Sequence, residues 1–413
     1  MEHRPSEAST LARPQELPSG LMIGLDVGST TVKAVVMDPA TDAILWKDYQ
    51  RHETRQPEKV LEFLQRIERA FPIPTDRFRV FITGSGGAAL ADCVGARFVQ
   101  EVNAVSLAVE RFHPDAGSVI ELGGQDAKII IWVEDPTTGQ KRKLPSMNDK
   151  CAGGTGAVID KITAKLGLSP AELKALQYYD VKLHPVAGKC GVFAETDING
   201  LQKQGVPAGE LMASLFEALV QQNLSVLTRG NTLRPKVLLL GGPNTFIPAL
   251  QDAWRHHIPK IWVERGVKLP EGVDPKSLII VPEDAQYFGS VLFGKEEAPH
   301  VGRYTGTAAL VEYAEHGRKK MREASGVPGL VRSPDELEEF ARRYSIPPFQ
   351  PARFQRGQVV EAYVGIDGGS TSTKAVLMDA DGNLLVKAYR LSQGNPIEDT
   401  RQILAELRRQ VEE

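Results

Sequence analysis

Two cysteines stand beside small residues that could expose their thiols to a ligand. Cys151 opens the run CAGGTG, in which small side chains leave backbone N–H groups uncovered. Cys190 lies in KCGVFAE, ahead of a segment that we expect to begin a helix. Free amides and helix N-termini stabilise negative charge, so both thiols lie where a large, negatively charged ligand could bind. Ordinary buried thiols and a redox disulfide pair are the alternatives.

The third cysteine lacks these features. Cys93 stands in ALADCVGARF without a glycine turn, and we expect it to belong to the core. Three cysteines cannot form a disulfide framework for 413 residues, which favours a reducing, cytoplasmic compartment.

Three further glycine-rich turns each follow an apolar run. Glycines let the backbone approach a phosphate closely, and a neighbouring carboxylate can hold hydrated Mg²⁺. One such turn is a weak signal, but three at these separations predict a phosphate-binding cleft. The sequence has no G-x-x-x-x-G-K-[ST] segment, and GSGGAA after Ile82 matches the dinucleotide motif poorly. The three turns are Asp26 to Thr30, Glu121 to Asp126 and Gly241 to Asn244.

Apolar patterns around the turns predict the elements that position them. LMIGLDVGSTTVKAVVMD, from Leu21, predicts two strands around the first turn, and SVIELGGQDAKIIIWVED, from Ser118, predicts the same around the second. A strand at about 43–49, a helix at about 58–70 and a long helix at about 211–228 complete the pattern. Because the strand–turn–strand unit occurs twice, the sequence predicts an α/β fold of two similar half-domains around a cleft.

The first hairpin also has a near copy later in the chain. GLDVGSTTVKAVVMD at 24–38 and GIDGGSTSTKAVLMD at 365–379 share ten of fifteen residues at an offset of 341. The copy contains too few elements to bury its apolar faces, so we expect the sequence to be part of a longer protein. The predicted organisation is a disordered tail (1–20), half-domain I (21–117), half-domain II (118–298, whose last helix could pack back on half-domain I), a connector (299–358) and the beginning of a second module (359–413).

Composition excludes two classes of partner. The chain has 49 Lys and Arg against 52 Asp and Glu, and no basic run stands out, which argues against nucleic acid and anionic membranes. No apolar run reaches transmembrane length.

Together these motifs resemble the actin, sugar kinase and Hsp70 superfamily. Within it they are similar to the ATP-dependent activators (activases) of 2-hydroxyacyl-CoA dehydratases and the ATPase subunits of benzoyl-CoA reductases. The resemblance covers about 21–298 and implies an actin-like, ribonuclease H-like ATPase. Its signatures are a DxGST turn at 26–30, a GGQD turn at 123–126, an NDKCAxGTG segment at 148–156 and a cysteine followed by xFAE at 190–195. The copy at 359–413 is absent from the compact activators and is similar to the start of a second actin-like module in long, multidomain members.

The resemblance also implies a site for ATP or ADP with Mg²⁺. Asp26 and Asp126 are the candidates that organise Mg²⁺ and the attacking water, with Gln125 assisting. Glu121 stands where relatives usually have Asp, and Pro243 removes one N–H donor from the third turn. The residues expected to bind nucleotide are Gly28, Ser29, Thr30, Lys33, Gly123, Gly124, Gly241, Gly242 and Asn244.

For the cysteines, the resemblance implies a [4Fe–4S] cluster shared between two subunits. Cys151 and Cys190 from each chain would be its ligands, at a homodimer interface. A ferredoxin or flavodoxin would donate the electron, and an iron–sulfur dehydratase or reductase would accept it. Two other functions stay open, namely a sugar-type kinase in which the cysteines are incidental and a non-catalytic ATP-dependent switch.

Overall fold

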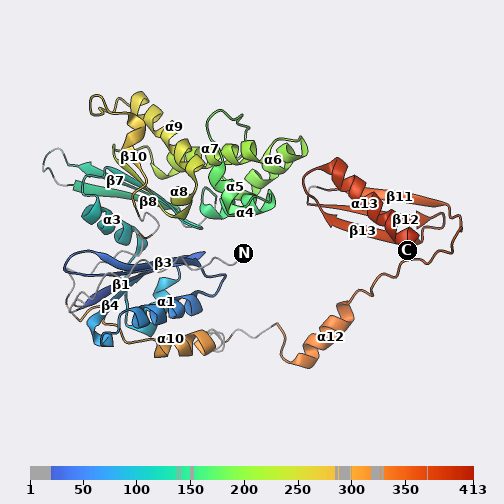
Figure 1. The fold of residues 1–413 in the computed structure, drawn as a ribbon, viewed down its shortest axis with the longest axis horizontal. Coiled ribbons are helices and arrows are strands. Elements are labelled where there is room, and N and C mark those ends of the chain that lie inside the picture. The colour runs from blue at the N-terminus through green and yellow to red at the C-terminus, as the bar shows by residue number, and fades with distance from the viewer. Residues whose placement is uncertain are drawn as a thin grey trace. The chain divides into compact units, whose positions relative to one another are not determined.

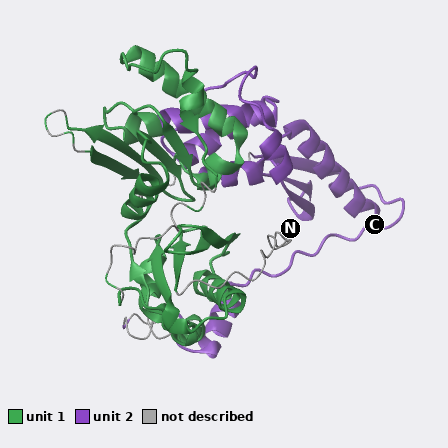
Figure 2. Cartoon of the chain, turned by 60° about the vertical axis from the view of Figure 1, so that its left-hand side comes forward, with its two compact units in different colours: residues 1–157, 223–321 green, residues 158–222, 322–413 purple. Residues whose placement is uncertain are grey.

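The computed structural model describes residues 20–135, 137, 139, 141–148, 153–283, 287, 298, 300–317, 326, 330–369 and 371–413. Contacts divide the chain into two compact units (Figure 2). Unit 1 comprises residues 1–157 and 223–321, and unit 2 comprises residues 158–222 and 322–413.

Unit 1 contains a first five-stranded sheet in the order β3-β2-β1-β4-β5 (Figure 1). β1 pairs antiparallel with β2 and parallel with β4. β1 and most of β2 are buried, as their near-continuous apolar sequences predict. The strands are β1 (Leu21–Val27), β2 (Thr31–Met37), β3 (Ile44–Arg51), β4 (Phe78–Thr83) and β5 (Arg97–Phe98).

Helices pack on this sheet through apolar stripes. α1 (Gln56–Ala70) buries Val60, Phe63, Leu64 and Ile67, which recur at helical spacing. The smaller elements here are η1 (Thr75–Arg77), α2 (Gly87–Ala91), η2 (Asp92–Val94), α10 (Ala308–Glu312) and the π-helical turn η5 (Tyr313–Gly317).

The segment that we predicted as a connector begins by returning to the first sheet. The Tyr304 N–H donates to the Phe78 carbonyl at 3.1 Å, and Leu310 of α10 lies in the same apolar cluster as α1 and β1. This part of the connector therefore completes the first core.

The second sheet repeats the plan of the first, with the order β10-β9-β6-β7-β8. β6 pairs antiparallel with β7 and parallel with β9, as β1 does with β2 and β4. The prediction of an α/β fold with two similar halves is thus confirmed. The strands are β6 (Ser118–Leu122), β7 (Ala127–Glu134), β8 (Lys141–Asn148), β9 (Val237–Leu240) and β10 (Ile279–Ile280), with helices α8 (Gly242–Phe246), α9 (Pro248–Glu264) and η3 (Pro275–Leu278).

α3 (Glu101–Phe112) lies between the two sheets. Its Val105 and Val109 belong to a cluster that also contains Met22 of the first sheet and Ile130 of the second. α3 is therefore packed against both sheets of unit 1.

Unit 2 contains a group of helices and the C-terminal copy. The copy forms an antiparallel three-stranded sheet, β11-β12-β13, whose small core includes Ala375, Val386 and Ile403. The three strands and one helix match the prediction. Unit 2 and its boundary with unit 1 contain α4 (Gly156–Lys165), α5 (Pro170–Ala175), α6 (Gly191–Lys203), α7 (Ala208–Leu227), α12 (Pro334–Tyr344), β11 (Ala362–Gly368), β12 (Ser372–Asp379), β13 (Leu384–Leu391) and α13 (Pro396–Glu412).

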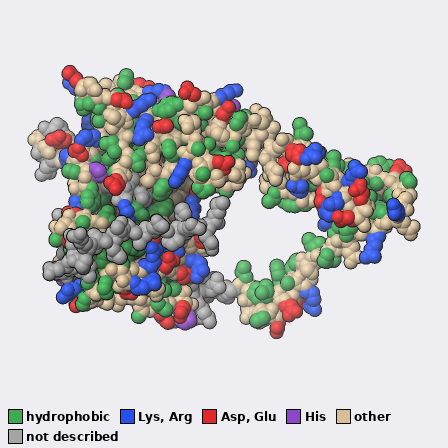
Figure 3. Space-filling view, in the orientation of Figure 1, with side chains coloured by type: hydrophobic (Ala, Val, Ile, Leu, Met, Phe, Trp, Pro, Cys, Tyr) green, Lys and Arg blue, Asp and Glu red, His purple; other side chains and the backbone are tan. Residues whose placement is uncertain are grey.

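The surface mixes both signs of charge. Figure 3 shows acidic and basic side chains interspersed over the viewed face. Among the described helices, none is both long and apolar enough to cross a membrane.

Candidate nucleotide site and cysteine segments

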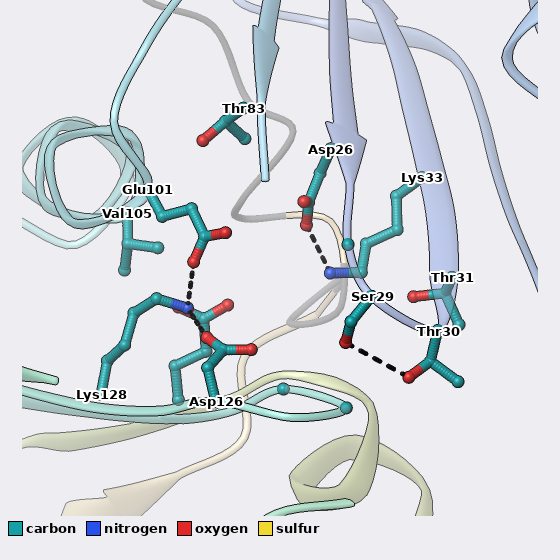
Figure 4. Close-up of a pocket in the computed structure, with 14 residues that line it drawn as sticks. Asp26, Ser29, Thr30, Thr31, Lys33, Thr83, Glu101, Val105, Asp126 and Lys128 are labelled. Atoms are coloured by element: carbon teal, nitrogen blue, oxygen red, sulfur yellow. Dashed lines mark hydrogen bonds and ion pairs between the residues drawn. The ribbon is translucent and has the colours of Figure 1, made fainter. Parts of the chain in front are cut away.

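A pocket in unit 1 lies between the two central hairpins (Figure 4). Its walls are the two glycine turns, the end of β4 at Thr83 and the start of α3 at Glu101. Eight of the predicted site residues line it, namely Asp26, Gly28, Ser29, Thr30, Lys33, Gly123, Gly124 and Asp126. The structure therefore brings together residues that lie about a hundred positions apart in the sequence.

The first hairpin carries a buried ion pair beside its turn. Asp26 and Lys33 stand opposite each other in the β1–β2 register, with Nζ 2.5 Å from Oδ2. Burial opposes the charge of Lys33, but the carboxylates of Asp26 and Glu121 raise the pKa of Lys33 above its ordinary value. The turn closes through a 2.9 Å hydrogen bond from the Gly28 N–H to the Thr31 carbonyl.

The second hairpin repeats this arrangement with different residues. Glu121 and Lys128 take the places of Asp26 and Lys33, and the Gly123 N–H donates to the Asp126 carbonyl at 2.9 Å. The Lys128 ammonium pairs with Asp126, with Glu101 at 2.8 Å and with Glu121 at 3.5 Å. Burial opposes its charge, yet these carboxylates hold the pKa of Lys128 well above its usual range. Burial in turn raises the pKa of Glu121.

Sequence reasoning missed five lining residues, of which Thr83, Glu101 and Lys128 carry the most polar groups and Thr31 and Val105 are the others. The signal for Lys128 was present, since it follows Glu121 by the same interval that separates Lys33 from Asp26. Thr83 and Glu101 come from β4 and α3, and no motif marks them. Only the fold brings them to the pocket.

The two glycine turns approach each other closely. A Cβ atom added to Gly124 would lie 2.1 Å from Thr30 Oγ1 and 3.3 Å from Ser29 Oγ. A side chain at this position would therefore push the first turn away. The glycine is needed because the backbone of one turn faces the hydroxyls of the other.

A second layer of polar residues holds the first turn in place. His52 Nδ1 accepts a hydrogen bond from the Thr54 N–H at 3.1 Å, so in the neutral ring the proton is on Nε2. That nitrogen lies 3.2 Å from the Gly28 carbonyl oxygen and donates to it, and Gln56 Nε2 donates to the same oxygen at 2.9 Å. His52 is buried, so these bonds fix the turn from the core side.

The remaining predicted nucleotide residues lie outside the pocket lining. Gly241 has φ +86° and packs on the Leu122 carbonyl, which leaves no room for a side chain. Asn244 is fully buried; its Nδ2 donates to the Leu240 carbonyl at 2.9 Å, and its Oδ1 accepts from Trp254 Nε1. These contacts anchor the third turn to the second sheet. Gly242 begins α8, and Gln125 is exposed at the tip of the second turn.

The segment that follows Cys151 is bonded to the second turn. The Gly156 and Ala157 N–H groups donate to the carbonyls of Gly123 and Gly124, at 3.0 and 2.7 Å. Thr155 Oγ1 also donates to the Gly124 carbonyl, at 3.1 Å. Cys151 itself lies outside the described residues. The start of α4 is thus attached directly to the GGQD turn.

The two described cysteines sit in opposite environments. Cys190 is the N-cap of α6, where the backbone N–H groups of Phe193 and Val192 lower the pKa of its thiol. Cys93 packs at the edge of the first core, as predicted, and burial raises the pKa of its thiol. Among the described residues, no group of three His, Cys, Asp or Glu side chains is arranged to hold a metal ion.

Comparisons with known proteins agree with this geometry. An uncharacterised protein of Methanocaldococcus jannaschii is 28% identical over 214 residues, which cover 51% of this chain and 81% of that protein. The (R)-2-hydroxyglutaryl-CoA dehydratase activating ATPase of Acidaminococcus fermentans is 25% identical over 220 residues, 53% of this chain and 82% of the relative.

A solved structure shares the fold. The activator of the 2-hydroxyisocaproyl-CoA dehydratase from Clostridium difficile, with bound ADPNP, aligns with a TM-score of 0.52 and 21% identity, over 76% of this chain and 100% of that chain. The model of the BadF/BadG/BcrA/BcrD ATPase family matches residues 23–254, more than half of the sequence. This match covers both central hairpins and the third glycine turn, and the chain therefore belongs to the BadF/BadG/BcrA/BcrD ATPase family.

Proposed function

We propose that this ATPase is an activator that uses ATP hydrolysis to send low-potential electrons into an iron–sulfur dehydratase or reductase. The relatives named as dehydratase activators support a dehydratase as the protein that accepts the electrons. The observation that carries the proposal is the set of hydrogen bonds between the GGQD turn and the segment after Cys151.

ATP or ADP would bind with its phosphates between the two glycine turns. Asp26 and Asp126 suit hydrated Mg²⁺, which neutralises phosphate charge when bound. Lys33, Ser29 and Thr30 would donate to phosphate oxygens, and Asp126 with Gln125 would orient the attacking water. Catalysis of this kind depends on positioning and charge more than on a strong base.

Movement of the second turn would be passed to the cysteine segment. Three donors from Thr155, Gly156 and Ala157 hold the carbonyls of Gly123 and Gly124. A turn that shifts when the γ-phosphate is lost must either move the start of α4 or break these bonds. Either result would change how the segment that follows Cys151 is attached to the second turn.

Cys151 and Cys190 would hold a [4Fe–4S] cluster together with the same residues of a second copy. Of these two ligands, Cys190 lies among the described residues. It suits a cluster, because backbone N–H groups at the start of α6 favour its thiolate. Beside it, the side chains of Val192 and Phe193 are 62% and 65% exposed, an apolar surface that a homodimer would cover. When bound, the cluster would supply a one-electron centre, with ferredoxin or flavodoxin as donor.

Anaerobic purification tests this proposal. We expect about two irons per chain, since each subunit supplies half of the ligands. Cys190→Ser should lose both iron and the stable dimer, whereas Cys93→Ser should lose neither. EPR spectra of the reduced protein should differ between Mg-ATP and Mg-ADP. Iron retained in Cys190→Ser, or identical spectra in both nucleotides, would contradict the proposal.

A further inference from the structure

One helix, α7, contacts the chain after Cys151 and the chain before Cys190. Near the C-terminal end of this helix, Asn223 Nδ2 donates to the Gly154 carbonyl at 2.8 Å. Gly154 follows Cys151 by three residues and has φ +81°, a left-handed conformation that favours glycine. The bond from Asn223 therefore fixes the direction of a backbone carbonyl in the segment that follows Cys151.

The chain before Cys190 lies along a second part of α7. The His184 N–H donates to Ser214 Oγ at 2.9 Å. Further along this segment, a Cβ atom added to Gly188 would lie 2.5 Å from the Ala218 carbonyl oxygen, so the backbone here packs directly on the helix. Ser214 and Ala218 are four residues apart and lie on one face of α7. The same helix thus supports both cysteine segments.

Both polar side chains of α7 that make these bonds are buried. Ser214 is 1% exposed and Asn223 is 2% exposed, and neighbours in the helix such as Phe216 and Leu219 are apolar and equally buried. A polar group at such a position lowers stability unless a hydrogen bond compensates for its lost hydration. Apolar side chains would pack the core as well, so the backbone groups that they bind explain why serine and asparagine stand here.

We propose that Asn223 and Ser214 are positioning residues for the iron–sulfur cluster. Each acts through the backbone that it holds, which is the segment after Cys151 in one case and the segment before Cys190 in the other. α7 is a 20-residue helix, and side chains on such an element are placed more precisely than side chains on loops. This inference rests on the proposed function, in which the two cysteines hold the cluster.

The bond from Asn223 also gives the segment after Cys151 a fixed point. The donors of residues 155–157, directly after Gly154, bind the carbonyls of the second glycine turn. When that turn shifts with the nucleotide, the segment is pulled at these donors and is held at Gly154 by α7. The displacement therefore acts on a segment that has a defined attachment, instead of on a loose loop.

Three variants that each remove a side-chain hydrogen-bonding group from α7, or from the residue after it, test the inference. Asn223→Leu and Ser214→Ala remove the bonds to the cysteine segments. Thr228→Val is the matched control, because Thr228 Oγ1 donates to the Leu224 carbonyl at 2.7 Å and binds neither segment. Since each bond joins a side chain to a backbone group, we expect similar decreases in Tm for the three cluster-free variants.

Iron release to a chelator after anaerobic reconstitution gives the first measurement. We expect Asn223→Leu and Ser214→Ala to lose iron about tenfold faster than the wild-type protein, because changes to residues that hold metal ligands in place typically weaken metal binding by that much or more. Thr228→Val should release iron at the wild-type rate. EPR spectra of the reduced cluster should change in the first two variants and not in the control.

Hydrogen exchange of the cluster-free protein gives a second measurement. Asn223→Leu should speed the exchange of the amides of residues 155–157, and Ser214→Ala should speed that of the His184 amide, which loses its acceptor. Thr228→Val should change neither. If Asn223→Leu does not fold, Gly188→Ala replaces it, because its methyl group pushes the segment before the second ligand away from α7 and should also speed iron release.

The outcomes separate this inference from the proposed function. Wild-type protein that holds no iron after reconstitution would overturn the proposed function and this inference with it. Normal iron content in the wild type, with release rates and EPR spectra of Asn223→Leu and Ser214→Ala that equal those of Thr228→Val, would overturn this inference alone.

Discussion

The hairpin at residues 24–38 and its copy at residues 365–379 have the same local geometry. Asp26 faces Lys33 in one register, and Asp367 faces Lys374 in the other. The two turns close through equivalent hydrogen bonds, from Gly28 N–H at 2.9 Å and from Gly369 N–H at 3.0 Å. Ten shared residues of fifteen are enough to set the turn, the register and the ion pair.

The surroundings of the two hairpins differ. β1 has β2 on one side and β4 on the other, whereas β11 is an edge strand of a three-stranded sheet. The side chains of Asp26 and Lys33 are 9% and 11% exposed, but those of Asp367 and Lys374 are 67% and 48% exposed. Local sequence therefore specifies the hairpin, and the neighbouring elements decide whether its charges are buried.

The support behind the turn differs as well. In the first hairpin, His52 and Gln56 donate to the Gly28 carbonyl, and the His52 N–H donates to the Thr30 carbonyl. In the copy, Ser392 takes the place of His52, since its N–H donates to the Thr371 carbonyl. Its hydroxyl donates to Asp399 instead of to the glycine turn. The turn of the first hairpin is thus held by two side-chain hydrogen bonds, from His52 and Gln56 to the Gly28 carbonyl.

The largest expected effect concerns the two aspartates. Asp26→Asn should lower ATP hydrolysis by about 10²–10³-fold, because the role proposed for Asp26, to organise the metal and phosphates, requires its charge. Asp367→Asn removes the equivalent carboxylate from the exposed copy and should leave hydrolysis unchanged. Phosphate release under saturating Mg-ATP measures both. Equal losses in the two variants would mean that the copy takes part in the reaction.

The two lysines should differ in their effect on stability. Lys33→Met leaves Asp26 buried without its counter-charge and should lower the free energy of unfolding by roughly 3–5 kcal/mol. Lys374→Met breaks an exposed pair, and we expect no detectable change, because solvent screens such charges. Urea denaturation of the two variants gives the comparison. A loss in Lys374→Met as large as that in Lys33→Met would show that the copy is buried in solution.

The contrast also explains what the sequence could and could not reveal. The two strand–turn–strand units and the helix at about 58–70 were predictable because their signals are local, in apolar spacing and glycines. Residues such as Thr83 and Glu101 were not, since strand order and the position of α3 bring them to the pocket. Asn244 shows a related limit. The sequence marks this polar residue in a glycine turn as a ligand, and only the fold shows that its side-chain amide is bonded within the core. Nucleotide binding by the third turn stays a prediction.

A smaller effect is expected when the hydrogen bond from His52 to the Gly28 carbonyl is removed. His52→Ser gives the first hairpin the residue of the copy and removes a hydrogen bond to the Gly28 carbonyl. Nucleotide affinity should fall by about fivefold to tenfold, the value of one intramolecular hydrogen bond, while Gln56 still holds the same oxygen. Calorimetry with Mg-ADPNP measures this change. Ser392→Ala is the control in the copy and should bind as the wild type does; an unchanged affinity in His52→Ser would show that Gln56 is sufficient.

The smallest change is a shift in pH dependence, and it extends the contrast between buried and exposed sites to the cysteines. Backbone N–H groups lower the pKa of Cys190, whereas burial raises the pKa of Cys93. Because only the thiolate reacts, alkylation of Cys190 should reach its full rate at a lower pH than alkylation of Cys93. Peptide mass spectrometry after timed exposure of cluster-free protein to iodoacetamide, over a series of pH values, measures both rates in one sample. Cys190→Ser and Cys93→Ser identify the two peptides. If both rates rise over the same pH range, the start of α6 does not favour a thiolate, and the electrostatic support for Cys190 as a cluster ligand is lost.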